Sequence, residues 1–254
     1  MVSLSEEFVM NNDKKIFIAG ASGVIGRTLC KILVEDGWNV YGSTRSEGKV
    51  EMLKSLGVEP VVVDVYDEKK LLEVLISIKP KIVMHQLTDL PAGLDPSKMQ
   101  EALVSNAKLR EVGTRNLVNA SKAAGVKKMI AQSIAFVYEP SELPHTEESA
   151  LLNFEDPVYG TTSKAVASLE EQVLNAPFIG IVLRNGLLYG EGTGFDEPVD
   201  FVPPLHVEAA AYAAFLAIDC EKSDVFNIAD NDERLSTAKA KSKFKWTPEF
   251  RTKK

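Results

Sequence analysis

The chain has 254 residues, of which 45% are hydrophobic and 26% charged, so a packed globular core is expected and a disordered chain is excluded. The formal net charge is −7 and no basic cluster precedes the last few residues, so neither nucleic acid nor an anionic membrane is expected as a partner. Cys30 and Cys220 lie far apart in apolar surroundings, which predicts buried thiols and a cytoplasmic location. No apolar run approaches membrane-spanning length, and His85, His145 and His206 lack the spacing of metal ligands.

The order of apolar runs and helical patterns predicts the fold. Residues 1–13 are polar and are interpreted as a lead-in. Strands are expected over 16–19, 39–43, 61–63, 82–85, 129–133 and 180–183, and helices over 27–36, 48–56, 68–77, 97–125 and 162–175. This alternation predicts a doubly wound parallel sheet, a Rossmann α/β fold, over residues 14–185.

The remaining residues, 186–254, carry a different pattern. A Gly-, Pro- and acid-rich stretch through 204 precedes an expected helix over 207–218, a strand over 225–228 and a polar tail. Because this region is too short to bury a core of its own, it is interpreted as a shortened substrate lobe rather than an independent domain.

The stretch 20–26, Gly-Ala-Ser-Gly-Val-Ile-Gly, lies between the first expected strand and the first expected helix. Strand, glycine turn and helix in this order are typical of a dinucleotide site. Gly20 allows a tight turn, Gly23 lets a pyrophosphate approach the backbone, and Gly26 lets the helix pack close to the sheet. The helix N-terminus then offers N–H groups to the phosphates. The cofactor-binding residues predicted here are Gly20, Ser22, Gly23, Val24, Ile25 and Gly26.

The end of the second expected strand bears on the choice between NAD and NADP. An acidic residue there would bind the ribose 2′-hydroxyl, but this chain has Thr44, Arg45 and Ser46. A guanidinium with neighbouring hydroxyl donors suits a 2′-phosphate, so NADP is favoured, with NAD as the alternative. The other interpretation is that Arg45 is a solvated loop charge.

The spacing Gly-x-x-Gly-x-x-Gly resembles that of the short-chain dehydrogenase/reductase superfamily, and in particular its extended, epimerase/dehydratase-like branch. Further segments resemble motifs of that branch, and they lie at 113–117, 123–128, 133–138, 157–160, 183–192, 206–210 and 235–248. The resemblance spans nearly the whole chain. It implies that Asp64, followed by Val65, contacts the adenine, although a turn or helix-capping role is equally open. His85 is expected to pack near the cofactor without a catalytic role.

The resemblance also implies a catalytic set, which this sequence matches imperfectly. The family uses a tyrosine as acid/base, a lysine four residues later and a hydroxyl that holds the substrate oxygen. Tyr159, Lys164 and Ser133 are the candidates, but Lys164 comes one residue late. The hydroxyl position, counted back from Tyr138, falls on Ile134. A helical residue is rotated by about 100° for each step along the chain, and strand neighbours face opposite ways, so either local irregularity compensates or the pair is not a catalytic dyad.

Two further departures concern the central helix and the substrate region. Arg110 occupies the place of a family asparagine, while Asn106 lies one turn upstream. The loop 191–205 is short, and the acids Asp196, Glu197 and Asp200 in it disfavour a nucleotide diphosphate. A small carbonyl or hydroxyl substrate is therefore expected.

Two functions remain open from the sequence. The first is an NAD(P)-dependent oxidoreductase or epimerase/dehydratase-like enzyme that moves hydride to or from a small or sugar-like molecule. The second is a non-catalytic dinucleotide-binding scaffold or redox sensor with a degenerate site. The helices expected over 97–125 and 162–175 match the family's dimer interface, so a homodimer is expected unless their apolar faces serve only the sheet.

Overall fold

The computed structural model describes residues 14–252, so the polar lead-in at 1–13 lies outside the described residues. Its centre is a sheet of seven parallel strands in the order β3-β2-β1-β4-β5-β6-β9. The strands are β1 (Lys15–Ala19), β2 (Asn39–Thr44), β3 (Glu59–Val62), β4 (Ile82–His85), β5 (Lys128–Ile134), β6 (Ile179–Asn185) and β9 (Asp224–Ile228). The chain order reverses between β1 and β4, the crevice where such sheets bind ligands, and the predicted doubly wound fold is confirmed.

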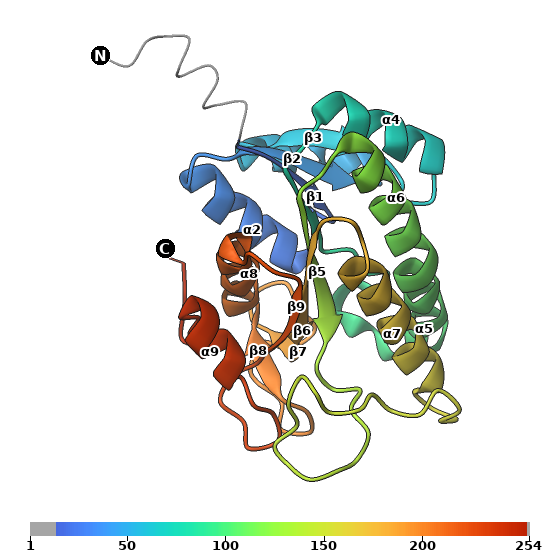
Figure 1. The fold of residues 1–254 in the computed structure, drawn as a ribbon, viewed down its shortest axis with the longest axis vertical. Coiled ribbons are helices and arrows are strands. Elements are labelled where there is room, and N and C mark those ends of the chain that lie inside the picture. The colour runs from blue at the N-terminus through green and yellow to red at the C-terminus, as the bar shows by residue number, and fades with distance from the viewer. Residues whose placement is uncertain (1–13, 253–254) are drawn as a thin grey trace.

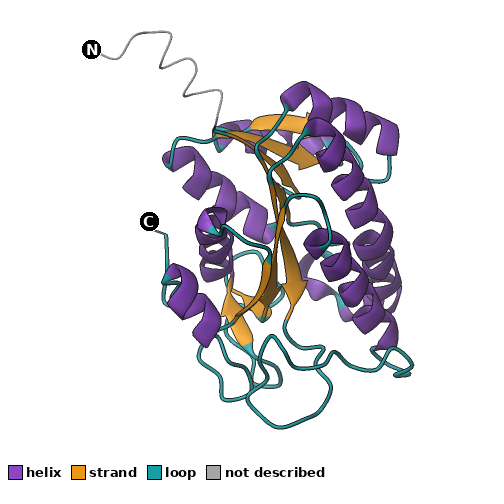
Figure 2. Ribbon diagram, viewed as in Figure 1, coloured by secondary structure: helices purple, strands orange, loops and turns teal. Residues whose placement is uncertain are grey.

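Helices cover both faces of this sheet (Figures 1 and 2). One face carries α2 (Val24–Glu35), α3 (Val50–Ser55) and α8 (Val207–Leu216), with α9 (Ala238–Phe244) beside them. The other carries α4 (Glu68–Ile78), α5 (Met99–Lys108), α6 (Thr114–Ala124) and α7 (Gly160–Leu174). Strand side chains alternate between the two cores: Ile16 and Ile18 pack toward α2, and Phe17 packs toward α4 and α6.

The helix predicted over 97–125 is interrupted. A short 3₁₀ turn, η3 (Pro96–Lys98), leads into α5, and a π-helical turn, η4 (Leu109–Gly113), separates α5 from α6. At Gly113 a Cβ atom would lie 2.8 Å from a Leu109 side-chain carbon and 3.1 Å from one of Val65, so glycine lets this wide turn pack closely. A π turn holds one more residue than an α-helical turn, so α5 and α6 do not share one continuous helical register.

The predicted lobe at 186–254 does not separate from the main fold. Its strand β9 is the outermost strand of the sheet, and its helix α8 packs on α2. Six of the ten residues of α8 are buried, five of them alanines, so the helix packs closely between α2 and the sheet. What lies outside the layers is a small two-stranded sheet, β7 (Leu187–Tyr189) with β8 (Pro204–His206), and the loop between them. Among the described residues, no helix combines the length and apolar character needed to cross a bilayer.

Candidate functional site

The glycine turn lies at the carboxyl end of β1, between β1 and α2. Gly20 has a φ of +90°, and a Cβ atom there would lie 2.6 Å from the Gln86 carbonyl oxygen. A Cβ on Gly26 would lie 2.3 Å from the Gly20 carbonyl oxygen, so only glycine allows α2 to begin this close to the turn. Gly23 is exposed and caps α2 without a side-chain hydrogen bond. The turn is therefore a bare backbone cradle.

The first turn of α2 supplies the donors of that cradle. The Arg27 N–H closes the first helical hydrogen bond onto the Gly23 carbonyl, so the N–H groups of Val24, Ile25 and Gly26 precede the helical ladder. The Arg27 guanidinium reaches the loop after β7, where a Cβ atom on Gly192 would lie 2.5 Å from Arg27 Nη2. Three backbone donors and a nearby cation fit a pyrophosphate. The sequence analysis missed Arg27. A cation is unfavourable in the first turn of a helix, so its presence there is a signal for a bound anion.

The region predicted to bind the adenosine end of the cofactor lies around Thr44 at the end of β2. Its buried hydroxyl oxygen accepts hydrogen bonds from the Ser22 hydroxyl at 3.3 Å and the Ser46 N–H at 3.2 Å. Arg45 is half exposed and forms an ion pair with Asp89, in the loop after β4, at 2.9 Å. The hydrogen bond that Arg45 donates to Asp89 raises the pKa of Arg45, so the guanidinium stays charged. Asp89 was not anticipated from the sequence, because it lies 44 positions from its partner.

The turn after β3 positions Asp64 and Val65. One carboxylate oxygen of Asp64 accepts the Tyr66 N–H at 2.9 Å, so the residue stabilises the turn, one of the roles left open from the sequence. Val65 is buried, and its carbonyl accepts a hydrogen bond from the Asn116 side chain at 3.0 Å. The strand end thus rests on α6.

His85 is fully buried at the end of β4. Its Nδ1 accepts the Leu87 N–H at 3.4 Å, which leaves Nε2 to donate to the Thr114 hydroxyl at 2.8 Å. Burial, with a contribution from the nearby Arg110 charge, lowers the pKa of His85 to about 4. The histidine is a neutral support for the loop after β4. The same loop is held by Asn106, whose side-chain oxygen accepts the Asp89 N–H at 3.0 Å.

Ser133 is held inside a buried polar network between β5, β6 and α7. Its hydroxyl donates to Glu170 at 2.8 Å, and Arg184 makes a bidentate ion pair with the same carboxylate at 2.9 and 2.6 Å. Burial opposes the charge on Arg184, but the hydrogen bonds to Glu170, the attraction of its carboxylate and the interactions with Tyr138 together outweigh burial and raise the pKa of Arg184. The Ser133 side chain therefore faces α7 and not the open edge of the sheet, while Ile134 takes the opposite face.

The Tyr159–Lys164 pair is not brought together on one buried face. Tyr159 caps α7 and its side chain is 54% exposed, and Lys164 lies on the exposed side of the helix. Position 163, four residues after the tyrosine, holds Ser163, which is fully buried and donates its hydroxyl to the Leu152 carbonyl at 2.6 Å. The N-terminus of α7 is fixed by Asp156, whose carboxylate accepts the Tyr159 N–H.

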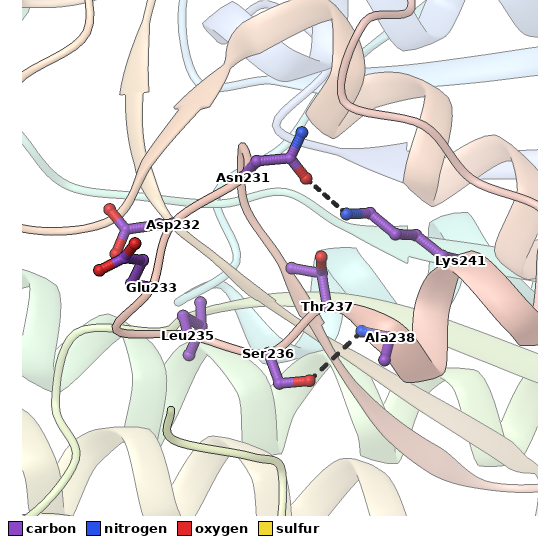
Figure 3. A pocket seen from close by; sticks show the side chains of 8 residues that line it. All are labelled: Asn231, Asp232, Glu233, Leu235, Ser236, Thr237, Ala238 and Lys241. Carbon is purple, nitrogen blue, oxygen red and sulfur yellow. Dashed lines mark hydrogen bonds between the residues drawn. The ribbon is translucent and has the colours of Figure 1, made fainter. Parts of the chain in front are cut away.

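A hollow of about 430 Å³ lies elsewhere, between the segment after β9 and α9. Figure 3 shows its lining, which includes Asn231 bonded to Lys241 and Ser236 bonded to the Ala238 N–H. No residue of the glycine turn or of α7 lines it. We therefore place the candidate site at the carboxyl edge of the sheet and not in this hollow.

Known proteins were compared with the sequence and the fold. The sequence matches the NAD dependent epimerase/dehydratase family over residues 16–228. It is 33% identical over 238 residues to a 3-diazoavenalumate denitrifying reductase from a Streptomyces species, and this alignment covers 86% of this chain and 76% of that protein. It is 25% identical over 244 residues to a decarboxylating sterol-4-alpha-carboxylate 3-dehydrogenase of Dictyostelium discoideum, which covers 86% and 72%.

Solved structures show the same fold. The UDP-glucose 4-epimerase of Thermotoga maritima, solved with UDP-glucose, aligns with a TM-score of 0.75 at 20% identity over 92% of this chain and 94% of that chain. The UDP-glucose 4-epimerase of Thermus thermophilus, solved with NAD, aligns with a TM-score of 0.72 at 19% identity over 94% and 95%. At these identities the likeness concerns the fold alone.

The sequence relatives include a named reductase, a named dehydrogenase and a UDP-glucose 4-epimerase, and none of the comparisons supports the scaffold alternative. The glycine turn, the free donors of α2 and the parallel sheet fit the dinucleotide that such enzymes use. This chain therefore belongs to the NAD-dependent epimerase/dehydratase family and is an NAD(P)-dependent enzyme of the oxidoreductase or epimerase type.

Proposed function

We propose that the protein is an NADPH-dependent reductase of a small electrophile whose reduction needs no proton from the enzyme. The observation that carries the proposal is a contrast within the site. The backbone donors of α2 face no side-chain cap, whereas the candidate proton-transfer groups are either engaged elsewhere or apart from one another.

The cofactor part of the proposal assigns each end of the dinucleotide. The turn 20–26 and Arg27 would hold the pyrophosphate, with the residues Gly20, Ser22, Gly23, Val24, Ile25 and Gly26 forming the cradle. Thr44, Arg45 and Ser46 would hold the ribose 2′-phosphate, which supports NADP over NAD. Asp64 and Val65 would border the adenine, and His85 would support the loop beneath the cofactor.

The reaction part of the proposal follows from proton balance. Bound reduced nicotinamide supplies a hydride. When a carbonyl accepts a hydride it becomes an alkoxide and needs a proton, which Tyr159 with Lys164 would have to provide. An aryl diazonium accepts the hydride at its terminal nitrogen and becomes a neutral aryldiazene, which loses N₂ and leaves a C–H bond. The reduction of the diazonium therefore needs neither a hydroxyl at position 134 nor a proton from the Tyr159–Lys164 pair.

The name of the Streptomyces relative describes the reductive removal of nitrogen from a diazo compound, which supports this substrate class for the present chain. A nucleotide sugar is less suitable, because exposed acids lie in the loop 191–202 next to Arg27. Carbonyl reduction through Tyr159 is the second candidate, and it is favoured by the exposure of that phenol at the N-terminus of α7.

The test is an assay of NADPH oxidation with an aryl diazonium salt, an aromatic aldehyde and a UDP-sugar, with N₂ and arene measured as products. The wild type is expected to reduce the diazonium with 1:1 formation of arene. Tyr159→Phe is expected to change that rate less than twofold, whereas loss of an acid lowers carbonyl reduction by about 100-fold or more. Val158→Ala, an exposed neighbour, is the matched control. Turnover of the aldehyde alone, abolished by Tyr159→Phe, would favour the second candidate instead.

Two organisational predictions remain proposals. The loop between β7 and β8, together with the chain after β9, would form the substrate side of the site within the region 186–254. A homodimer would form through α5, α6 and α7, where Val104 presents an exposed apolar side chain on α5. Light scattering of the wild type and of Val104→Glu tests the dimer, since a charge at that interface should yield monomers.

A further inference from the structure

Two buried amide side chains lie at the carboxyl ends of β4 and β6 with hydrogen-bonding atoms that have no partner. Gln86 is 5% exposed, and both its Nε2 and its Oε1 are unpaired; Asn185 is 4% exposed, and its Oδ1 is unpaired. Buried polar groups in folded proteins are nearly always paired, and exceptions point to a ligand or a functional role. The side chain of neither residue has a part in the site as described so far.

The strand pattern places these side chains on one face of the sheet. β4 directs Ile82 and Met84 into the core beneath α2 and α8, and β6 directs Ile181 and Leu183 into the same core. Gln86 continues the alternation of β4, because its N–H still bonds the Ala19 carbonyl at 2.8 Å. Asn185 continues that of β6. Both amides therefore lie at the upper end of the α2/α8 face.

Gln86 borders the predicted nucleotide cradle, and Asn185 lies two strands away at the same edge of the sheet. The backbone of Gln86 lies directly against Gly20, and Asn185 pairs in register with Ile134 on β5, between β4 and β6. Gln132, on β5, spans the same region by donating from its side chain to the Leu87 carbonyl at 3.4 Å. The Gln132 side-chain nitrogen thus has a partner within the protein, while both polar atoms of the Gln86 side chain and the Asn185 side-chain oxygen have none.

The unpaired atoms define a complementary ligand. They comprise two carbonyl oxygens and one NH₂ group, so the ligand must present two N–H donors and one carbonyl acceptor. A primary carboxamide has this set. Interchange of the oxygen and nitrogen of Gln86 leaves the set unchanged, because both atoms are unpaired.

We propose that Gln86 and Asn185 bind the carboxamide of the nicotinamide ring and thereby fix which face of the ring is turned toward the substrate. The inference rests on the proposed use of a nicotinamide cofactor. It assigns two side chains to the nicotinamide end of the cofactor, where they would orient the ring, whereas the glycine turn would bind the pyrophosphate.

The experiment compares three ligands by isothermal titration: NADP⁺, its 3-acetylpyridine analogue, which lacks the carboxamide NH₂, and 2′-phospho-ADP-ribose, which lacks the whole ring. In Gln86→Met and Asn185→Leu, NADP⁺ is expected to bind about 10- to 100-fold more weakly. The affinity for 2′-phospho-ADP-ribose should change less than twofold. The acetylpyridine analogue should bind the wild type more weakly than NADP⁺ does, and the variants should no longer distinguish the two.

Gln132→Met is the control, because its amide is already bonded within the protein. Both test variants replace unpaired polar groups by apolar groups of similar size, so their melting temperatures should be equal to or above that of the wild type. A parallel loss for NADP⁺ and 2′-phospho-ADP-ribose, or no loss for NADP⁺, would overturn the proposal. If the wild type binds neither ligand, the proposed cofactor fails as well, which is a distinct result.

Discussion

The two halves of the carboxyl edge differ in what their polar groups do. Around β1, β2 and α2, backbone and side-chain donors are held in place but leave bonding capacity toward the edge: the α2 cap lacks a side-chain acceptor, and Thr44 only accepts. Around β5, β6 and α7, the hydroxyl of Ser133 and the charges of Glu170 and Arg184 satisfy one another inside the protein. The polar groups of the first half are available to a ligand, whereas the Ser133–Glu170–Arg184 network of the second half stabilises the fold, and the unpaired Asn185 oxygen at the end of β6 is the exception there.

The largest effect is expected from breaking the network of the second half. Glu170→Gln leaves Arg184 as a buried charge without its counterion, which should lower the free energy of unfolding by about 3–5 kcal/mol in urea titrations. Glu171→Gln, on the exposed side of the same helix, should stay within about 0.5 kcal/mol. If Glu170→Gln left the stability unchanged but abolished reductase activity, Ser133 and Glu170 would have a role in catalysis, and the proposed difference between the two halves would be wrong.

His85 lies between the two halves, and its protonation can be followed through the pH dependence of the free energy of unfolding. Its pKa is about 4 in the folded protein and near 6.5 when unfolded, so between these values only the unfolded chain takes up the proton. The free energy of unfolding should therefore fall by about 3 kcal/mol as the pH drops from 6.5 to 4. His85→Gln should remove this part of the pH dependence, and an unchanged slope in the variant would show that other groups cause it.

The nucleotide half is tested through Arg45. Arg45→Ala should weaken NADPH binding by about 10- to 100-fold, the usual value of one or more hydrogen bonds to a charged group, with little change for NADH. Lys49→Ala, an exposed cation in the adjoining turn, serves as the control in fluorescence titrations. Equal affinities for both nucleotides in the wild type would contradict the assignment of the 2′-phosphate to this strand end.

The smallest effect is expected at the partner of that arginine. Asp89→Asn removes the carboxylate that pairs with Arg45 at 2.9 Å and that would repel a 2′-phosphate. NADPH affinity should rise by up to about fivefold, in keeping with the modest strength of partly exposed ion pairs. A decrease would mean that Asp89 mainly orients the guanidinium.

The strand, glycine turn and helix at residues 15–35 were predictable from the sequence because most of their determinants are local. Gly26 is required by its contacts with Gly20 and Ala21, within six residues of chain, and Arg45 follows directly from the end of a strand, whereas the close contact at Gly20 is with Gln86 on another strand end. The π turn at Leu109–Gly113 was not predictable, since its helical periodicity matches that of an uninterrupted helix. The engagement of Ser133 by Glu170 and the pairing of Arg45 with Asp89 join residues 37 and 44 positions apart, so they required the fold.

The burial of Ser163 constrains how this protein could acquire new chemistry. Restoring the family spacing would put a lysine at that position, where the native hydroxyl is fully enclosed and bonded to the Leu152 carbonyl. A buried ammonium without a counterion costs several kcal/mol, a large part of the stability of an ordinary domain. Single substitutions toward a conventional carbonyl reductase would thus be eliminated before any benefit in catalysis arose. Descendants of this sequence are held to substrates that tolerate the present arrangement, unless the loop 139–159 and α7 change together.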